Sequence, residues 1–294
     1  MAAALTTLSW CGENVRLADV DAALARLRAE AAAEAPSMRT SVMTHVAWVP
    51  AEWIEPARAA LAGMAERHPS RTILLFPQPE ATGSGIDARA EVERWSVPGT
   101  DRGLVTEVVE LTLRGRRARA PGSIVEPLVI ADLPVFLRWR GEPPWGASEL
   151  EQLVDVTDRL IVDSTEWEAL PGPYRRLAEL FSRCAASDIA WARTSRWRAH
   201  LATLWPAIAD VATVHVRGTA AQAWLLCGWL RSRLGRPEIA LEHAPADRLE
   251  GVALDGEPVP LPPGEPPAPS EVLSDELDRL TPDPVYEAAV LAVA

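Results

Sequence analysis

The segments Val42-Met-Thr-His-Val-Ala-Trp-Val49 and Thr72-Ile-Leu-Leu-Phe76 decide the fold class of this chain. Both are short, largely apolar runs, which are typical of buried strands in a parallel sheet. Between them, residues 52–67 carry apolar side chains at helical spacing, which predicts a helix. Pro56 is tolerated in the first turn of this helix, and Pro69 ends it. A strand, a helix and a second strand joined by a crossover of this length predict a parallel βαβ unit.

The rest of the N-terminal half extends this unit into a sheet covered by helices. Residues 87–97 and 104–113 predict an antiparallel hairpin, because the second run alternates in polarity and a Pro/Gly-rich turn lies between them. Ser148 and Glu151 are spaced as a capping box that would open a helix. Other expected elements are a helix over 118–129 and strands at 135–139 and 160–162.

The C-terminal half predicts a second, smaller α/β domain after Pro171-Gly-Pro173. The helix over 219–234 is apolar nearly all round and should be buried, with Gly235 as its C-terminal cap. Other expected elements are helices over 174–184 and 188–205, strands at 213–216, 238–242 and 249–254, and short terminal helices near 271–280 and after Pro284.

These elements divide the chain into four parts. We expect an N-terminal helical extension at 1–37, whose amphipathic helix at 17–34 would be loosely docked, and an N-terminal domain at 38–170 with a mixed, mostly parallel sheet and flanking helices. The C-terminal α/β domain would occupy 171–257, and a proline-rich connector with a helical tail would occupy 258–294.

Composition excludes several classes of function. The 294 residues carry a net charge of −12, from 29 basic and 41 acidic side chains, and every basic residue is arginine. An acidic surface disfavours nucleic-acid binding and anionic membranes, where basic side chains supply the affinity. No apolar run is long enough to span a membrane and the first residues lack a signal peptide, so we expect a cytoplasmic protein. Cys11, Cys184 and Cys227 are too widely spaced for a disulfide framework or a zinc site.

One arginine- and tryptophan-rich segment stands out, Ser187-Asp-Ile-Ala-Trp-Ala-Arg-Thr-Ser-Arg-Trp-Arg198. Asp188 can cap a helix, and Trp197 begins an apolar stripe with Leu201, Leu204 and Trp205. Arg193 would lie against Trp197, one turn away. Two interpretations stay open: a core helix with solvated arginines, or a surface for an anionic or protein partner. In the second interpretation, the partner would be contacted by Arg193, Arg196 and Arg198. The structural residues would be Asp188, Trp191 and Trp197.

The same segment resembles a signature of the OpcA family, the glucose-6-phosphate dehydrogenase assembly proteins of actinobacteria and cyanobacteria. Other family-like stretches follow in the expected order: Arg67–Arg71, Glu126–Trp139, Asp158–Ser164 and Asp283–Tyr286. The resemblance spans residues 36–290. It implies a partner of glucose-6-phosphate dehydrogenase that promotes its assembly or activates it allosterically, without a cofactor. Some cyanobacterial relatives are thought to respond to redox state through cysteines, and the absence of an obvious pair here argues against that behaviour.

No catalytic motif accompanies the resemblance. The sequence lacks Gly-x-Ser-x-Gly, Gly-x-x-x-x-Gly-Lys-[Ser/Thr], Gly-x-Gly-x-x-Gly and His-Glu-x-x-His. We therefore predict no catalytic residue, no cofactor and no metal site, and interpret His45 as a core histidine. Trp139 and Trp145 flank a loop that could form an exposed, partner-binding edge. The alternatives are a sugar-phosphate or nucleotide-binding enzyme that uses the C-terminal arginines, or a metabolite-sensing module; Arg217-Gly-Thr219 is a weak phosphate-binding signal.

Overall fold

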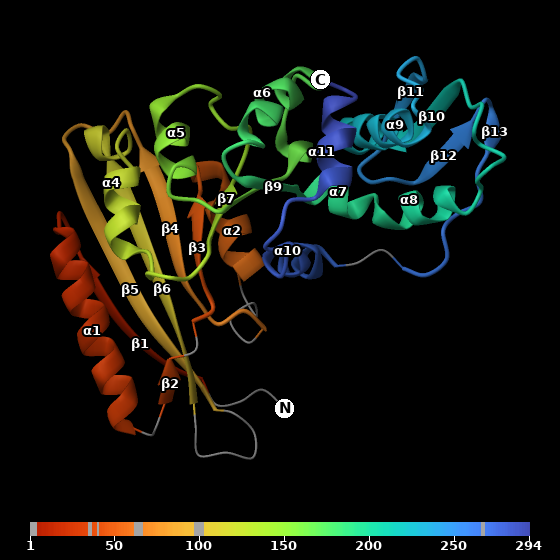
Figure 1. Cartoon of the computed structure of the whole chain (residues 1–294). Helices are drawn as coiled ribbons and strands as arrows, with labels where there is room; N and C mark the ends of the chain where they lie inside the picture. The colour runs from red at the N-terminus through yellow and green to blue at the C-terminus, as the bar shows by residue number, and fades with distance from the viewer. Residues whose placement is uncertain (1–4, 35–36, 40, 62–66, 97–102, 266–267) are drawn as a thin grey trace. The chain divides into compact units, whose positions relative to one another are not determined.

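The structure is a computed structural model that describes residues 5–34, 37–39, 41–61, 67–96, 103–265 and 268–294. The chain divides into two compact units, unit 1 at Met1–Leu160 and unit 2 at Ile161–Ala294. Each unit has its own sheet with helices packed on it (Figure 1). The predicted fold class, a two-domain α/β protein with a mixed, mostly parallel N-terminal sheet and a smaller C-terminal domain, is confirmed.

The sheet of unit 1 contains β1 (Leu5–Gly12), β2 (Ser37–Arg39), β3 (Met43–Trp48), β4 (Ser70–Gln78), β5 (Gly85–Ser96), β6 (Gly103–Arg114) and β7 (Val135–Trp139). The strand order is β1-β5-β6-β4-β3-β7, with β2 paired to β6. The pairs β2–β6, β4–β6, β3–β4 and β3–β7 are parallel, and β1–β5 and β5–β6 are antiparallel. The predicted βαβ unit and the predicted hairpin are therefore both present.

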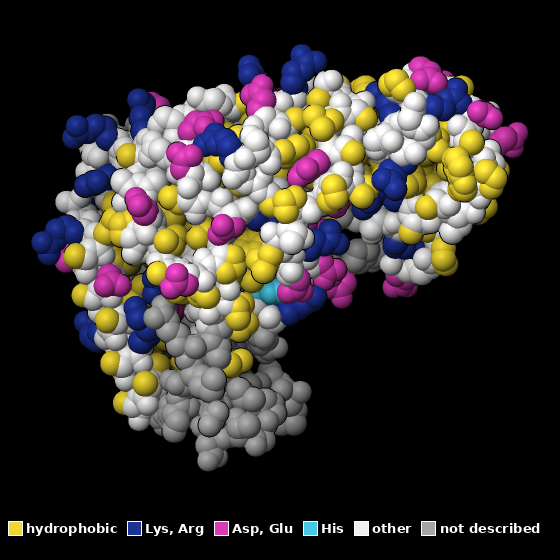
Figure 2. Space-filling view, in the orientation of Figure 1, with side chains coloured by type: hydrophobic (Ala, Val, Ile, Leu, Met, Phe, Trp, Pro, Cys, Tyr) yellow, Lys and Arg dark blue, Asp and Glu magenta, His cyan; other side chains and the backbone are white. Residues whose placement is uncertain are grey.

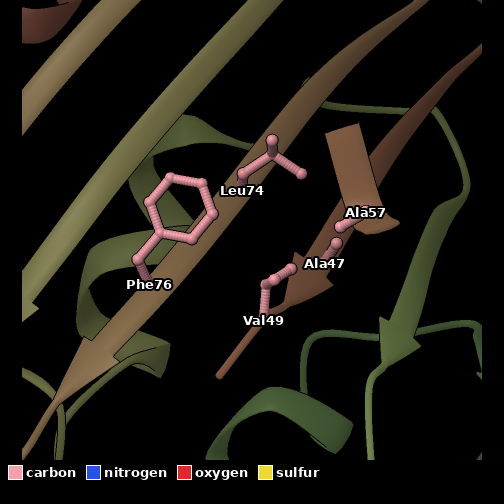
Figure 3. Close-up of a cluster of buried hydrophobic side chains, with 5 residues drawn as sticks. All are labelled: Ala47, Val49, Ala57, Leu74 and Phe76. Atoms are coloured by element: carbon pink, nitrogen blue, oxygen red, sulfur yellow. The ribbon is translucent and has the colours of Figure 1, made fainter. Parts of the chain in front are cut away.

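The helix of the βαβ unit covers the core of unit 1. It comprises η1 (Ala51–Trp53) and α2 (Ile54–Leu61), and the remainder of the expected helix, residues 62–66, lies outside the described residues. Ala57 of α2 packs on side chains from β3 and β4 and from the residue that follows β3 (Figure 3). This cluster consists of Ala47, Val49, Ala57, Leu74 and Phe76, all almost completely buried. Alternate residues of each buried strand thus supply the apolar face that the helix covers.

The N-terminal residues contribute to unit 1 rather than forming a loose appendage. β1 pairs with β5 along its whole length, from Leu5 opposite Trp95 to Gly12 opposite Ala88. α1 (Leu17–Glu34) buries Val20, Leu24 and Leu27 and contacts β5. The apolar side of the amphipathic helix is therefore part of the core.

Two local predictions in unit 1 are wrong. The helix expected over 118–129 is replaced by η2 (Gly115–Arg117), α4 (Gly122–Val125) and η3 (Glu126–Leu128), because Pro121 and Pro127 lack the N–H groups that a continuous helix needs. α5 (Ser148–Val154) begins after Ala147 with no side-chain cap. The hydroxyl of Ser148 instead accepts a hydrogen bond from Gln152 at 2.8 Å, so the expected capping box is absent.

Unit 2 has a four-stranded sheet in the order β11-β10-β12-β13. Its strands are β10 (Thr213–Gly218), β11 (Ala240–Pro245), β12 (Gly251–Leu254) and β13 (Glu257–Pro258). The boundary between the two units falls within β8 (Arg159–Val162), and β9 (Ala185–Asp188) is hydrogen-bonded to β8. The helical elements are η4 (Ser164–Glu166), α6 (Gly172–Leu180), α7 (Ile189–Arg193), α8 (Ser195–Ala202), α9 (Ala220–Leu234), α10 (Pro269–Leu277) and α11 (Pro284–Leu291).

The central helix of unit 2 is α9, as its apolar sequence predicts. Thr219 and Gln222 form a capping box at its start, and Gly235 ends it in the left-handed conformation with φ of 67°. α7 and α11 both pack on α9 (Figure 1). A Cβ at Gly228 would lie 2.2 Å from the carbonyl oxygen of Ala289, so only glycine permits this close approach of α9 and α11.

The helix expected over 188–205 is interrupted at Thr194. The Thr194 N–H closes a three-residue turn onto the Trp191 carbonyl at 3.0 Å, and its hydroxyl donates to the same oxygen at 2.8 Å. Local side-chain bonds of this kind compete with helical ones, which separates α7 from α8. The apolar stripe also ends early, because α8 ends at Ala202: Trp197 and Leu201 are buried, whereas Trp205 is 62% exposed.

Candidate functional site

The centre of unit 2 is a group of buried polar side chains, which we call the Asp188 cluster: Ser164, Tyr174, Asp188 and Tyr286. One carboxylate oxygen of Asp188 accepts from the N–H groups of Ser164 (3.0 Å) and Ala190 (2.8 Å). The other accepts from the Ser164 hydroxyl at 2.6 Å and, more distantly, from the Tyr286 hydroxyl at 3.5 Å. All four side chains are completely buried. The aspartate therefore joins β9, η4 and α11 through hydrogen bonds while also capping α7.

No ion pair joins Asp188 to a basic residue anywhere in the described part of the chain. Burial, and then the charge of Asp163, raises the pKa of the Asp188 carboxyl from 3.8 to about 7, although the hydrogen bonds from Ser164 and Ala190 act in the opposite direction. Burial also raises the pKa of Tyr174 and of Tyr286 well above the ordinary value of 10.0, so both phenols stay protonated. The cluster is thus neutral or singly negative near neutral pH.

A layer of aromatic contacts surrounds the Asp188 cluster. The indole N–H of Trp191 donates to Asp283 at 3.0 Å, and Asp283 also caps α11 by accepting from Val285 and Tyr286. The guanidinium of Arg198 lies 3.4 Å from the ring centre of Trp191, a close cation–π contact. Three of the five segments that carry the family resemblance, Asp158–Ser164, Asp188–Arg198 and Asp283–Tyr286, therefore meet in one place.

The other two arginines of the segment also have internal partners. Arg193 pairs with Asp163 at 3.2 Å, and does not form the expected stack on Trp197 among the contacts described. Arg196 donates to the carbonyl oxygens of Pro262 (2.9 Å), Pro263 (2.9 Å) and Gly264. It thereby holds residues 262–264, which we call the proline strap. A partner could still contact these arginines, so their role in recognition stays a prediction.

The two tryptophans predicted at a partner-binding edge belong to unit 1. Trp139 is 1% exposed and stacks on Trp48 with ring centres 4.9 Å apart. Trp145 is half-buried, and its indole N–H donates to Glu142 at 3.1 Å. Trp139 is therefore a core residue and cannot contact a partner directly. Of the two, only Trp145 has an accessible side chain that a partner could contact.

A cavity of about 790 Å³ opens beside the arginine segment in unit 2. We call it the arginine cavity; its lining is Thr165, Arg193, Arg196, Trp197, Thr219, Gln222, Asp247, Arg248, Leu249, Glu250, Leu261, Pro262 and Gly264. Arg193, Arg196, Trp197 and Thr219 were singled out from the sequence, whereas Arg248 was not. The Asp188 cluster was also only partly predicted: Ser164 and Tyr286 belong to family-like stretches but were given no role, and Tyr174 belongs to none.

Within the described residues, no three histidine, cysteine or carboxylate side chains are grouped as metal ligands. No described helix is long and apolar enough to cross a membrane. Figure 2 shows acidic and arginine side chains interspersed on the face it draws. Cys184 and Cys227 are buried and Cys11 is exposed, and none of the three is in a disulfide.

These features define a two-unit α/β protein whose second unit is organised around one buried, hydrogen-bonded aspartate. A family model described as the glucose-6-phosphate dehydrogenase subunit N-terminal domain matches residues 61–180, and its C-terminal counterpart matches residues 184–290. The two matches together cover more than three quarters of the sequence, and the chain belongs to the OpcA family.

Curated relatives agree with this assignment. A protein named putative OxPP cycle protein OpcA from Nostoc punctiforme is 25% identical over 197 residues, which are 63% of this chain and 42% of the relative. A protein of the same name from Synechocystis is 24% identical over 194 residues, 62% of this chain and 40% of the relative. This chain thus spans about two fifths of the length of these relatives.

Proposed function

We propose that this chain is a non-catalytic partner of glucose-6-phosphate dehydrogenase that promotes assembly of the dehydrogenase or activates it allosterically. It would do so in the oxidative pentose phosphate pathway and in the cytoplasm. The observation that carries the proposal is the ordered match of both dehydrogenase-subunit models to this one chain. The names of the cyanobacterial relatives support the same pathway.

The contacts in unit 2 are compatible with a partner rather than with an enzyme. The most perturbed carboxyl group, Asp188, is enclosed by backbone and hydroxyl donors and is completely buried, so no substrate reaches it without an opening of the unit. Arg193 and Arg198 contact Asp163 and Trp191. These groups are used to hold η4, α7 and α11 together, which favours a structural role for the family-like segments.

The proposed effect requires only a modest energetic preference. An activator must bind the active form of the dehydrogenase more tightly than the inactive form, and that difference sets the size of its effect. A tenfold rise in activity corresponds to about 1.4 kcal/mol of differential binding.

We propose that the exposed part of the arginine segment belongs to the binding surface. Beyond the segment in the chain, Trp205 is 62% exposed and can anchor a partner through its aromatic ring. Arg196 holds the proline strap of the same unit. Arg193 and Arg198 are each partly exposed, so their outer atoms can contribute as well. Trp145 in unit 1 is the corresponding candidate there.

The test is the rate of NADP reduction by the dehydrogenase of the same organism, measured with and without this chain. We expect the chain to raise the rate and to show no turnover alone with glucose 6-phosphate and NADP. An unchanged rate over a range of chain concentrations would contradict the proposal. Turnover by the chain alone would favour the alternative, a sugar-phosphate or nucleotide-binding enzyme.

A further inference from the structure

The arginine cavity has an excess of positive charge although the whole chain has a net charge of −12. Two of its five charged lining residues are neutralised by ion pairs, Arg193 by Asp163 at 3.2 Å and Glu250 by Arg217 at 2.9 Å. Among the residues described, Arg196 donates hydrogen bonds only to carbonyl oxygens, which carry no net charge. The charged lining residues outside these ion pairs are therefore Arg196, Arg248 and Asp247. Two of these are positive and one is negative, so their summed charge is positive.

Arg248 is the group most available to a ligand. Its side chain is exposed, and no hydrogen bond or ion pair joins it to another residue in the described ranges. Its backbone, however, is held in place on both sides. Ala246 donates to the Gly218 carbonyl at 2.9 Å, and Glu250 donates to the Arg217 carbonyl at 2.8 Å. A free guanidinium on a fixed loop is a suitable donor for an anionic group.

The turn between β10 and α9 forms a second side of the cavity. Gly218 lies so close to the neighbouring loop that a Cβ there would be 3.0 Å from the Cα of Leu249. Thr219 and Gln222 line the cavity from the first turn of α9, a helix of 15 residues. The partial positive charge of this helix end adds to that of the arginines.

The third side is apolar and adjoins Arg196. Trp197, Leu249, Leu261 and Pro262 supply carbon surface against which a sugar or base ring can pack. Arg196, which also lines the cavity, reaches the strap through one guanidinium nitrogen, Nη2. Its Nε and Nη1 make no hydrogen bond to the residues that the structure describes.

We propose that the arginine cavity binds a small phosphorylated metabolite, with the phosphate held by Arg248 and Arg196 and the organic part on the apolar side. The volume of about 790 Å³ accommodates a molecule of sugar-phosphate or mononucleotide size. The inference concerns this chain alone and does not depend on the proposed dehydrogenase partner. Its site belongs entirely to unit 2.

The experiment is calorimetric titration of the purified chain in a phosphate-free buffer. The probes are glucose 6-phosphate and AMP, with inorganic phosphate as the minimal anion and glucose and adenosine as the matched neutral compounds. We expect at least one phosphate ester to bind at submillimolar to millimolar concentration and its neutral counterpart to bind far more weakly. Equal binding of ester and neutral compound, or no binding of any ester, would overturn the proposal.

Variants then locate the site. Arg248→Gln should weaken ester binding about tenfold or more, because a charge-assisted hydrogen bond is lost. Asp247→Asn should strengthen binding, because it removes the repelling charge beside Arg248. Arg233→Gln is the matched control, since Arg233 is also exposed but lies at the other end of α9. Equal effects of the Arg233 and Arg248 variants, or none from either, would overturn the assignment to this cavity. Thermal unfolding of each variant checks that the fold is intact.

Discussion

The two units bury carboxylates by different means. In unit 1, Glu107 lies between two arginines, with Arg71 at 2.6 Å and Arg28 at 3.1 Å. In unit 2, Asp188 is equally buried but receives hydrogen bonds from backbone N–H and hydroxyl groups and has no ion-pair partner in the part of the chain that is described. A buried carboxylate can thus be balanced by an opposite charge or solvated by dipoles. In the second arrangement, at Asp188, burial raises the pKa of the carboxyl to about 7.

Replacing each of these carboxylates by its amide tests whether the two sites differ in this way. Glu107→Gln leaves Arg71 buried without its countercharge, so we expect a loss of about 3–5 kcal/mol in the free energy of unfolding. Asp188→Asn removes no cation's partner and keeps an acceptor for the two N–H donors, so we expect a change of about 1 kcal/mol or less at neutral pH. Urea unfolding of both variants at pH 7 measures this contrast. Equal losses would refute it.

Asp188 should also make unit 2 less stable as pH rises. Between the unfolded pKa of 3.8 and the folded value of about 7, the folded protein retains a proton that the unfolded chain releases. Stability is therefore greatest below this window and falls by a few kcal/mol as pH rises through it, since each pKa unit corresponds to about 1.4 kcal/mol. Asp188→Asn should abolish this dependence. A wild-type and variant pair with parallel stability curves from pH 4 to 8 would contradict the prediction.

His45 in unit 1 should have the opposite effect. Burial, and then the charges of Arg138 and His68, lowers the pKa of His45 from 6.5 to about 4, and its Nε2 has no hydrogen-bond partner among the described residues. Within that window the unfolded chain binds a proton that the folded protein does not, so stability is lost as pH falls, by up to about 3 kcal/mol.

His45→Gln, which cannot titrate, separates the two effects. Its stability should be less sensitive to acid between pH 6.5 and 4 than that of the wild type, and should show the Asp188 dependence more clearly. Unchanged acid sensitivity in this variant would show that His45 does not carry it.

The smallest predicted effect concerns the aromatic layer of unit 2. Arg198→Gln removes the cation above Trp191 and should cost about 1 kcal/mol. Arg175→Gln is the control, because Arg175 is exposed on α6 and its side chain makes no hydrogen bond or ion pair with the described residues. Thermal melting should distinguish the two variants; a control that melts as early as Arg198→Gln would remove the case for the cation–π contact.

The local pattern of apolar and turn-forming residues predicted much of the fold, but it did not predict the contacts of the candidate functional site. The βαβ unit, the hairpin and α9 depend on hydrophobic runs and on a glycine cap, which are visible in a short window. β1 and β9 were missed: the latter is the four-residue run Ala-Ala-Ser-Asp, too short to show an alternating pattern.

The site depends on contacts between distant residues. Ser164 and Asp188 are 24 positions apart, and Trp191 and Asp283 are 92 apart. The sequence also suggested the wrong arginine for a stacked pair: Arg193 and Trp197 would be neighbours on a continuous helix, but the break at Thr194 brings Arg198 onto Trp191 instead. Family resemblance identified these segments without showing that they meet.

We propose above that this chain is a partner of glucose-6-phosphate dehydrogenase. The most direct test of this proposal is sedimentation velocity of the two purified proteins from one organism, alone and mixed at micromolar concentration. We expect a faster-sedimenting species that contains both chains and that forms with Asp188→Asn as well as with the wild type, since that variant keeps the fold. Independent sedimentation of the two proteins at every ratio would show that this chain is not such a partner.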